Sequence, residues 1–235
     1  MAWPGIARKF LPRTTLGWPG HTRPTKHPRK RDGNVAVMFV DIEGCTRLCE
    51  DLRPKEMNRV IETYFSRYLD IVRAGGGEVT EVLGDGLVAL FEGLSIRENT
   101  ARAILAALRI RESTHELNAR VRRRHDPIVV NIGLNAGRAS VGITRLLGQS
   151  GERWFYAATG PVTNIAARLC GLARQGQIFV TGKMAKLVSG TYQVRSLGPQ
   201  SLKNVSGPVE VFEILPTKVG QETRSGMTRR RGANG

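Results

Sequence analysis

The stretch EVTEVLGDGLVALF, residues 78–91, predicts two β-strands joined by a tight turn at Asp85 and Gly86. An Asp-Gly pair between two apolar runs is the strongest short hairpin signal that a sequence offers. A second apolar run, AVMFV at residues 36–40, predicts a buried strand that ends at Asp41. If the hairpin lies beside this strand, Asp41 and Asp85 come close together at one edge of a sheet.

Two carboxylates at one sheet edge suggest a site for two divalent cations. Mg²⁺ and Mn²⁺ take oxygen ligands, and Mg²⁺ typically binds one or two protein carboxylates together with phosphate oxygens of a substrate. Taken singly, each aspartate has a simpler explanation, because Asp85 suits a type I′ turn and Asp41 suits the cap of a following helix. The residues alone leave both interpretations open.

The rest of the chain predicts further helices and strands. Residues 54–74 place apolar side chains on one face at helical spacing, with Pro54 at the start and three glycines after the end. We expect a helix over 96–123, strands over 128–134 and 139–144, a helix over 162–173 that buries Ile165, Leu169 and Leu172, a strand over 177–180, a short helix near 183–187, and strands over 191–197 and 209–215. This order predicts an α+β fold in which helices cover one face of a mixed sheet.

Most of the charge lies near the two ends of the chain. The 235 residues suffice for one domain with a substantial core, and their formal charge is +16. Residues 1–31 contain eight Lys or Arg and no acid, and residues 216–235 contain five Lys or Arg and one Glu, which leaves the middle near +4. We therefore predict a basic disordered leader (1–32), one folded domain (33–215) and a basic disordered tail (216–235).

Composition also limits the compartment and the partners. No apolar run has the length of a signal peptide or a membrane span, and Cys45, Cys49 and Cys170 cannot all pair, so we expect a cytoplasmic protein with reduced thiols. The middle of the chain has no stacking or groove-reading motif, so nucleic acid is not an expected partner. The basic leader could contact an anionic membrane, although a dispensable leader explains it more simply.

Four motifs follow one another in the middle of the chain: FVDIEGCTRL at residues 39–48, LGDG at 83–86, NIGLNAG at 131–137 and VTNIAARL at 162–169. In this order they resemble the class III nucleotidyl cyclase catalytic domain. The resemblance extends over roughly residues 34–215, since LKNV at 202–205 and PVEVF at 208–212 are similar to the closing strands of that family. It implies a ferredoxin-like, palm-type α/β sandwich.

The resemblance also implies an activity, the conversion of ATP to 3′,5′-cyclic AMP and pyrophosphate. The ribose 3′-hydroxyl would attack the α-phosphorus in line with the leaving pyrophosphate. Two Mg²⁺ or Mn²⁺ ions would activate the hydroxyl and neutralise the leaving group. The implied ligands of these cations are Asp41, Asp85 and the backbone carbonyl of Ile42.

Two residues of the VTNIAARL motif complete the implied site. Asn164 and Arg168 lie four residues apart, hence on one side of a helix. From the residues alone, the simpler interpretation is a polar pair on the helix surface. By resemblance, the Asn164 amide orients the ribose and the Arg168 guanidinium stabilises charge that develops on the phosphate. Family geometry further implies a homodimer in which the aspartates of one chain face this pair of the other, with residues 144–154 as an arm toward the partner. Lys203 is the expected triphosphate contact, or else a solvated loop lysine.

The sequence departs from the family where the base is recognised. Adenylate cyclases have a lysine and an aspartate or threonine at positions that here hold Glu81 and Ala157. Glutamate accepts hydrogen bonds and matches the N1–H and N2 donors of guanine, whereas the Ala157 side chain can make no hydrogen bond. ATP remains the first expectation, because most bacterial-looking domains of this kind make cyclic AMP. GTP, relaxed specificity, and a catalytically silent nucleotide-binding regulatory domain remain alternatives.

Overall fold

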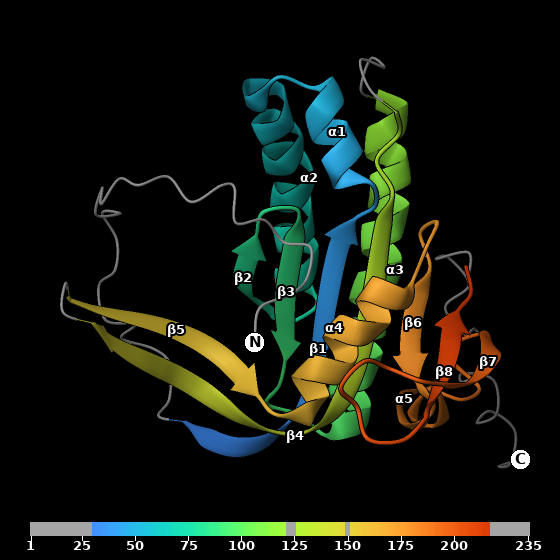
Figure 1. Cartoon of the computed structure of the whole chain (residues 1–235). Coiled ribbons are helices and arrows are strands. Elements are labelled where there is room, and N and C mark those ends of the chain that lie inside the picture. The colour runs from blue at the N-terminus through green and yellow to red at the C-terminus, as the bar shows by residue number, and fades with distance from the viewer. Residues whose placement is uncertain (1–29, 121–125, 149–150, 217–235) are drawn as a thin grey trace, which may run out of the picture.

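A computed structural model describes residues 30–120, 126–148 and 151–216. Within these residues, eight strands form one mixed sheet in the order β2-β3-β1-β4-β6-β8-β7, with β5 paired to β4 outside this path (Figure 1). Adjacent strands are antiparallel except for β4 and β6, which are parallel. The strands are β1 (Arg31–Ile42), β2 (Glu78–Leu83), β3 (Gly86–Phe91), β4 (Val130–Gly148), β5 (Gly151–Thr159), β6 (Ile178–Thr181), β7 (Val194–Gln200) and β8 (Val209–Ile214).

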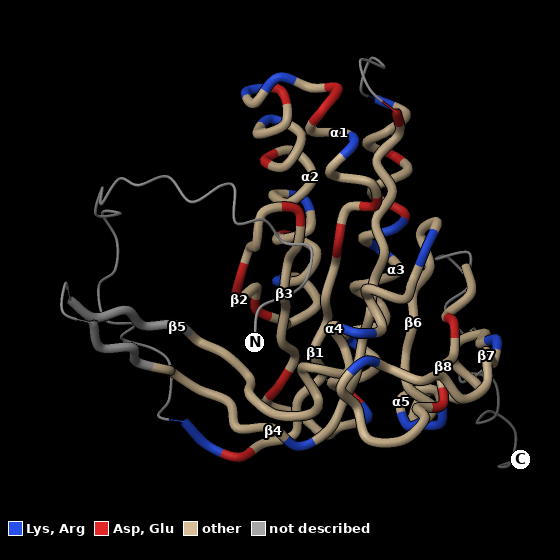
Figure 2. The backbone as a smooth tube through the Cα atoms, in the orientation of Figure 1, with Lys and Arg blue, Asp and Glu red and all other residues tan. Residues whose placement is uncertain are grey.

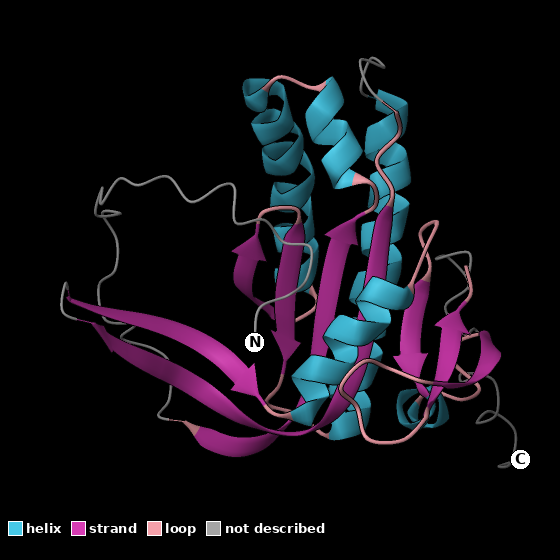
Figure 3. Ribbon diagram, viewed as in Figure 1, coloured by secondary structure: helices cyan, strands magenta, loops and turns pink. Residues whose placement is uncertain are grey.

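Helices pack on both faces of this sheet, not on one face as the sequence suggested (Figure 3). The even-numbered side chains Ala36, Met38 and Val40 of β1 belong to the larger core, which α2 and α3 cover. The odd-numbered Val35 and Val37 face the opposite way and pack with residues of α4. The helices are α1 (Cys45–Asp51), α2 (Pro54–Ala74), α3 (Ile96–Arg120), α4 (Pro161–Leu172) and α5 (Gly182–Leu187).

The predicted α+β fold with a mixed sheet is confirmed, and most elements lie close to their expected positions. The helix over 54–74 and the hairpin over 78–91 have the predicted bounds. The two strands expected over 128–134 and 139–144 are one continuous strand, β4, and β5 was not predicted. In α4 only Leu169 of the three expected core residues is buried, whereas Ile165 is half-buried and Leu172 is 38% exposed.

The ends of the chain bear on the predicted domain bounds. Residues 1–29 and 217–235 lie outside the described residues, so the disorder predicted for the leader and the tail stays a prediction. The same holds for residues 121–123 of the helix expected over 96–123. Arg31 and Asp32 already belong to β1, where they pair with Val141 and Ser140 of β4. Regular structure therefore begins two residues before the domain boundary that the sequence suggested.

Charged residues gather on α1, α2 and α3, and the middle strands of the sheet carry few of them (Figure 2). This distribution follows from burial, because the strands are covered on both faces while each helix has one solvated side. Among the described residues, no helix combines the length and the apolar character needed to cross a lipid bilayer.

Candidate active site

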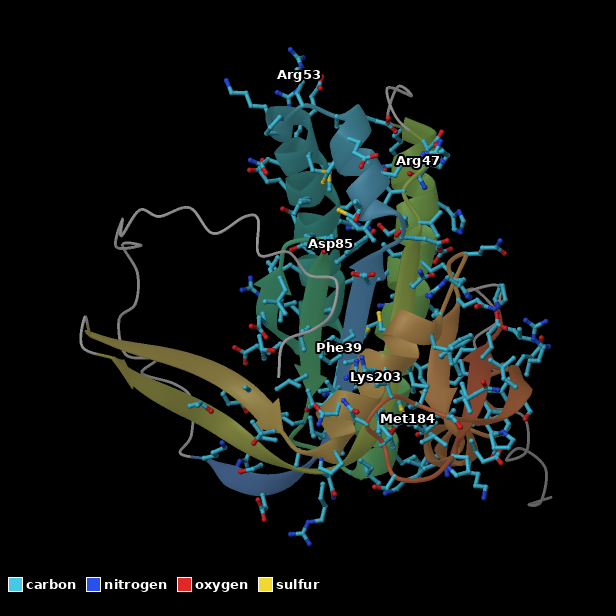
Figure 4. The ribbon with its side chains drawn as sticks, in the orientation of Figure 1. Phe39, Arg47, Arg53, Asp85, Met184 and Lys203 are labelled. Atoms are coloured by element: carbon cyan, nitrogen blue, oxygen red, sulfur yellow. The ribbon has the colours of Figure 1, made fainter. Side chains whose placement is uncertain are left out.

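Asp41 and Asp85 lie at the same edge of the sheet. Asp41 is next to last in β1 and pairs with Gly86 of β3 on one side and with Asn131 of β4 on the other. Asp85 occupies the turn between β2 and β3, and its backbone carbonyl accepts a hydrogen bond of 3.1 Å from the Ile42 amide. Figure 4 shows Asp85 at this end of the sheet, with Phe39 farther along β1. The structure therefore brings together the two carboxylates that the hairpin pattern singled out.

The electrostatics of this edge suit a cation. The pKa of Asp41 is raised to about 6, chiefly by burial and then by the nearby charge of Asp85, while the charge of Arg174 opposes both effects. No three His, Cys, Asp or Glu side chains cluster as a metal site within the described ranges. Two carboxylates beside open space are the donor set of a Mg²⁺ or Mn²⁺ site that shares its ions with phosphates. The residues present therefore fit the cations that the sequence implied.

The backbone of β1 directs the Ile42 carbonyl toward Asp85. The Glu43 amide donates a 2.9 Å hydrogen bond to the carbonyl of Val129, the residue just before β4. In a trans peptide the C=O of one residue points opposite to the N–H of the next. Since β1 lies between β3 and β4, the Ile42 carbonyl points to the β3 side. It is thus available as a third oxygen at the edge that the two aspartates form.

A cavity of about 290 Å³ opens beside the aspartates, between the sheet and α4. Its floor comes from β1 and the hairpin, and its roof comes from the second half of α4. Most of the lining is apolar, which lowers the local dielectric around the two carboxylates. The lining residues are Phe39, Val40, Asp41, Leu83, Asp85, Gly86, Leu87, Val88, Ala167, Cys170 and Gly171.

Helix α4 packs on the NIGLNAG motif of β4. Its alternate residues, Asn131, Gly133, Asn135 and Gly137, point to the α4 face, because the intervening Ile132 and Leu134 belong to the opposite core. A Cβ on Gly133 would lie 2.1 Å from the Cys170 backbone nitrogen, so only glycine permits this approach. The Asn135 amide donates to the Val162 carbonyl at 3.3 Å. Small and amide side chains thus fix the helix over the cavity.

Asn164 and Arg168 do not line the cavity that the aspartates share. Asn164 is exposed on α4, one turn before Arg168. Arg168 donates from Nε to the Lys203 carbonyl at 3.1 Å, so the loop between β7 and β8 holds this guanidinium. The Lys203 side chain is exposed, and Figure 4 shows it beside α4. The predicted catalytic pair and Lys203 therefore form a second group, apart from the aspartates of the same chain.

Glu81 and Ala157, the expected base-recognition residues, also lie outside the cavity. Glu81 is exposed on β2, at an irregularity in the pairing of β2 with β3. Ala157 is half-buried on β5, opposite Gly142 of β4. The two strands contact each other, which places both residues on the same side of the molecule as the β4–β5 hairpin.

Cys170 in the cavity lining, and Asn131 and Glu43 linked to it by hydrogen bonds, were given no role from the sequence. Cys170 lines the roof, and its thiol donates to the Asn131 carbonyl at 3.3 Å; burial raises the pKa of this thiol. Asn131 in turn donates from its amide to the Glu43 carboxylate at 3.1 Å. The alternation of small and amide residues in NIGLNAG was the available signal for Asn131, whereas nothing local marks its partner, Glu43.

Comparison with known proteins identifies a family. Residues 27–215 match the family described as the adenylate and guanylate cyclase catalytic domain. The chain is 25% identical over 185 residues to Adenylate cyclase 1 of Rhizobium meliloti, covering 77% of this chain and 27% of that protein. It is 26% identical over 212 residues to the receptor-type guanylate cyclase gcy-23 of Caenorhabditis elegans, covering 85% of this chain and 18% of that protein. The chain thus spans less than a third of the length of these relatives.

A solved structure shares the fold. The adenylyl cyclase CyaB of P. aeruginosa superposes with a TM-score of 0.74 at 20% identity, over 82% of this chain and 98% of that one. The family match covers most of the chain and includes both aspartates, the α4 motif and the closing strands. The chain therefore belongs to the family of adenylate and guanylate cyclase catalytic domains.

Proposed function

We propose that this chain converts ATP to 3′,5′-cyclic AMP and pyrophosphate. The observation that supports the proposal most directly is the pair Asp41 and Asp85 at one sheet edge beside an open cavity, with the pKa of Asp41 raised to about 6. A half-buried pair of like charges is costly unless a cation or a proton offsets it. Such strain at a cavity is typical of a functional site rather than of a structural one.

In the proposed reaction, the ribose 3′-hydroxyl attacks the α-phosphorus while pyrophosphate leaves from the opposite side. Asp41, Asp85 and the Ile42 carbonyl would hold two Mg²⁺ or Mn²⁺ ions, which supply Lewis-acid stabilisation of the attacking and leaving oxygens. Asp41 would also accept the proton of the attacking hydroxyl. The apolar cavity walls exclude water and strengthen the interactions of the charged groups.

We further propose that the active unit is a homodimer. Asn164 and Arg168 lie outside the cavity of their own chain, so they would act on the substrate held by the aspartates of a second copy. Leu83, in the cavity lining, is 48% exposed, and two apolar residues next to lining residues in the chain, Val82 and Leu172, are 52% and 38% exposed. A second copy that covered them would close the site, and the protruding β4–β5 hairpin is suited to reach it. Lys203, beside Arg168, would then contact the triphosphate.

GTP is the second candidate substrate, because Glu81 suits the hydrogen-bond donors of guanine. Ala157 offers no side-chain hydrogen bond to either base, which favours relaxed specificity over strict selection. Both an adenylate and a guanylate cyclase are among the relatives, at nearly equal identity. The cytoplasmic location stays a prediction.

The experiment that tests the proposal is turnover of ATP and GTP, each with Mg²⁺ and with Mn²⁺, by the unaltered chain and by Asp85→Ala. We expect a cyclic product that falls by about a hundredfold or more in the variant, since a cation ligand is lost. Asp51→Ala removes an exposed aspartate of α1 and is the matched control, with turnover unchanged. Absence of a cyclic product from either nucleotide, in protein shown to be dimeric, would instead favour the silent regulatory domain.

A further inference from the structure

Glu43, the residue that follows the cation edge of β1, joins three parts of the chain. Its carboxylate oxygen Oε2 accepts a hydrogen bond from the Asn131 side-chain amide at 3.1 Å. The same oxygen accepts a bond of 2.6 Å from the backbone amide of Gln175, in the turn after α4. A carboxylate that accepts two such bonds makes stronger contacts than a neutral acceptor. Glu43 thus links the end of β1 to the start of β4 and to the end of α4.

Asn131, on β4, also binds the turn after α4. Its side chain is buried, with 4% of the residue exposed, and its carbonyl Oδ1 accepts a 3.0 Å bond from the Gly176 amide. Its backbone carbonyl accepts the Cys170 thiol, which lies in the cavity roof. Two consecutive amides of the turn, those of Gln175 and Gly176, are therefore held by the Glu43–Asn131 pair.

This turn has a backbone that needs such support. Gln175 has φ of 53° and Gly176 has φ of 78°, so both lie in the left-handed region. A residue with a Cβ is disfavoured there, and it persists only where surrounding contacts hold it. The turn follows directly on the part of α4 that roofs the cavity. Without the hydrogen bonds from Glu43 and Asn131, the turn and the adjoining end of α4 would no longer be held in place above Asp41.

We propose that Glu43, acting through Asn131, is a positioning residue that keeps the Ile42 carbonyl and Asp41 in register with the α4 end of the cavity. The inference rests on the proposed cation site and extends it to side chains that touch neither substrate nor cation. Partners of this kind around a metal site orient its ligands, and their loss typically weakens cation binding tenfold or more.

The test is direct binding of Mn²⁺ to the full chain, followed by the electron paramagnetic resonance signal of free Mn²⁺ during a titration. We expect Glu43→Ala to raise the dissociation constant by about tenfold. Glu43→Gln should stay within about threefold of the unaltered chain, because the amide oxygen can still accept both bonds. The two variants lose the same charge, so their difference reports the hydrogen bonds alone. Glu50→Ala, at an exposed glutamate of α1, is the control for an unrelated charge loss.

A role in the fold alone would give a different result. Circular dichroism and the melting temperature establish that each variant is folded. If Glu43→Ala does not fold, Glu43→Asp takes its place, since it keeps the charge but is too short to reach both donors. In turnover, the cation concentration for half-maximal rate should rise while the KM for nucleotide at saturating cation stays constant.

Equal Mn²⁺ binding by folded Glu43→Ala (or Glu43→Asp) and by Glu43→Gln overturns the positioning role and leaves the proposed function standing. An unaltered chain that neither binds Mn²⁺ nor forms a cyclic product overturns the proposed function and this inference together.

Discussion

Asp41 is a residue at which function and stability oppose each other. Burial, and then the nearby charge of Asp85, raise the pKa of its half-buried carboxylate to about 6, so this group is charged at neutral pH at a cost to the folded state. Without cations, Asp41→Asn should therefore be more stable than the unaltered chain at pH 7.5, by about 1 kcal/mol once solvent screening is allowed for. This corresponds to a rise in melting temperature of roughly 3 °C, measured in the presence of a chelator.

The extra stability of Asp41→Asn should depend on pH in a defined direction. The folded state binds the Asp41 proton more tightly than the unfolded state does, so the destabilisation is complete above about pH 6 and fades as the pH falls toward 4. The advantage of Asp41→Asn should shrink over the same range. A melting temperature that is no higher than that of the unaltered chain at pH 7.5 would mean that the folded state does not disfavour a charged Asp41.

The two aspartates could be predicted from the sequence because each is marked by its immediate neighbours, a turn dipeptide for Asp85 and the end of an apolar run for Asp41. Glu43 has no such mark, and the local signal for Asn131 is only the alternation of small and amide residues in its motif. They lie 88 residues apart and meet only because β1 and β4 pair. Their role is a property of the tertiary structure, and spacing along the chain contains no information about it.

At the scale of elements, the contact between α4 and β4 depends on Gly133. A Cβ there would lie 2.1 Å from the Cys170 nitrogen and 2.4 Å from the Ala166 carbonyl, both of them backbone atoms that cannot move aside alone. We expect Gly133→Ala to destabilise the fold by about 3 kcal/mol or more. Gly171→Ala is the matched control, because nothing lies within 4 Å of its Cβ and alanine favours a helix by about 0.5–1 kcal/mol. Chemical denaturation of both variants measures the difference, and equal stabilities would contradict this packing.

The errors in the predicted elements have one physical source. Gly137 falls between the two strands expected over 128–134 and 139–144. The structure uses it to let Val162 of α4 approach, since a Cβ would lie 2.9 Å from Val162 Cγ2. Likewise, the period of α4 indicates that one side is buried but not which face of the sheet buries it. Period and turn chemistry predict elements, whereas their mutual placement depends on contacts between distant segments.

At the scale of the whole molecule, the proposed dimer predicts complementation between inactive variants. Asp85→Ala and Arg168→Ala should each be inactive alone. Mixed in equal amounts and allowed to exchange subunits, half of the dimers contain one chain of each kind, and each mixed dimer has one intact site. The mixture should therefore recover about a quarter of the unaltered activity. A mixture that stays inactive although the subunits exchange would place aspartate and arginine in the same site of one chain.

The continuity of β4 has a mechanical consequence. This strand runs for 19 residues, a contour length of roughly 60 Å. One end carries Asn131, which is tied to Glu43 beside the cation edge, and the other leaves the sheet to pair with β5 in the projecting hairpin. If a second subunit bent the hairpin, the continuous β4 strand would transmit this displacement to the cation edge, where the phosphates would bind. Dimer contact and catalysis would then depend on the same strand, so that a chain whose hairpin has no partner would hold its cation edge less rigidly.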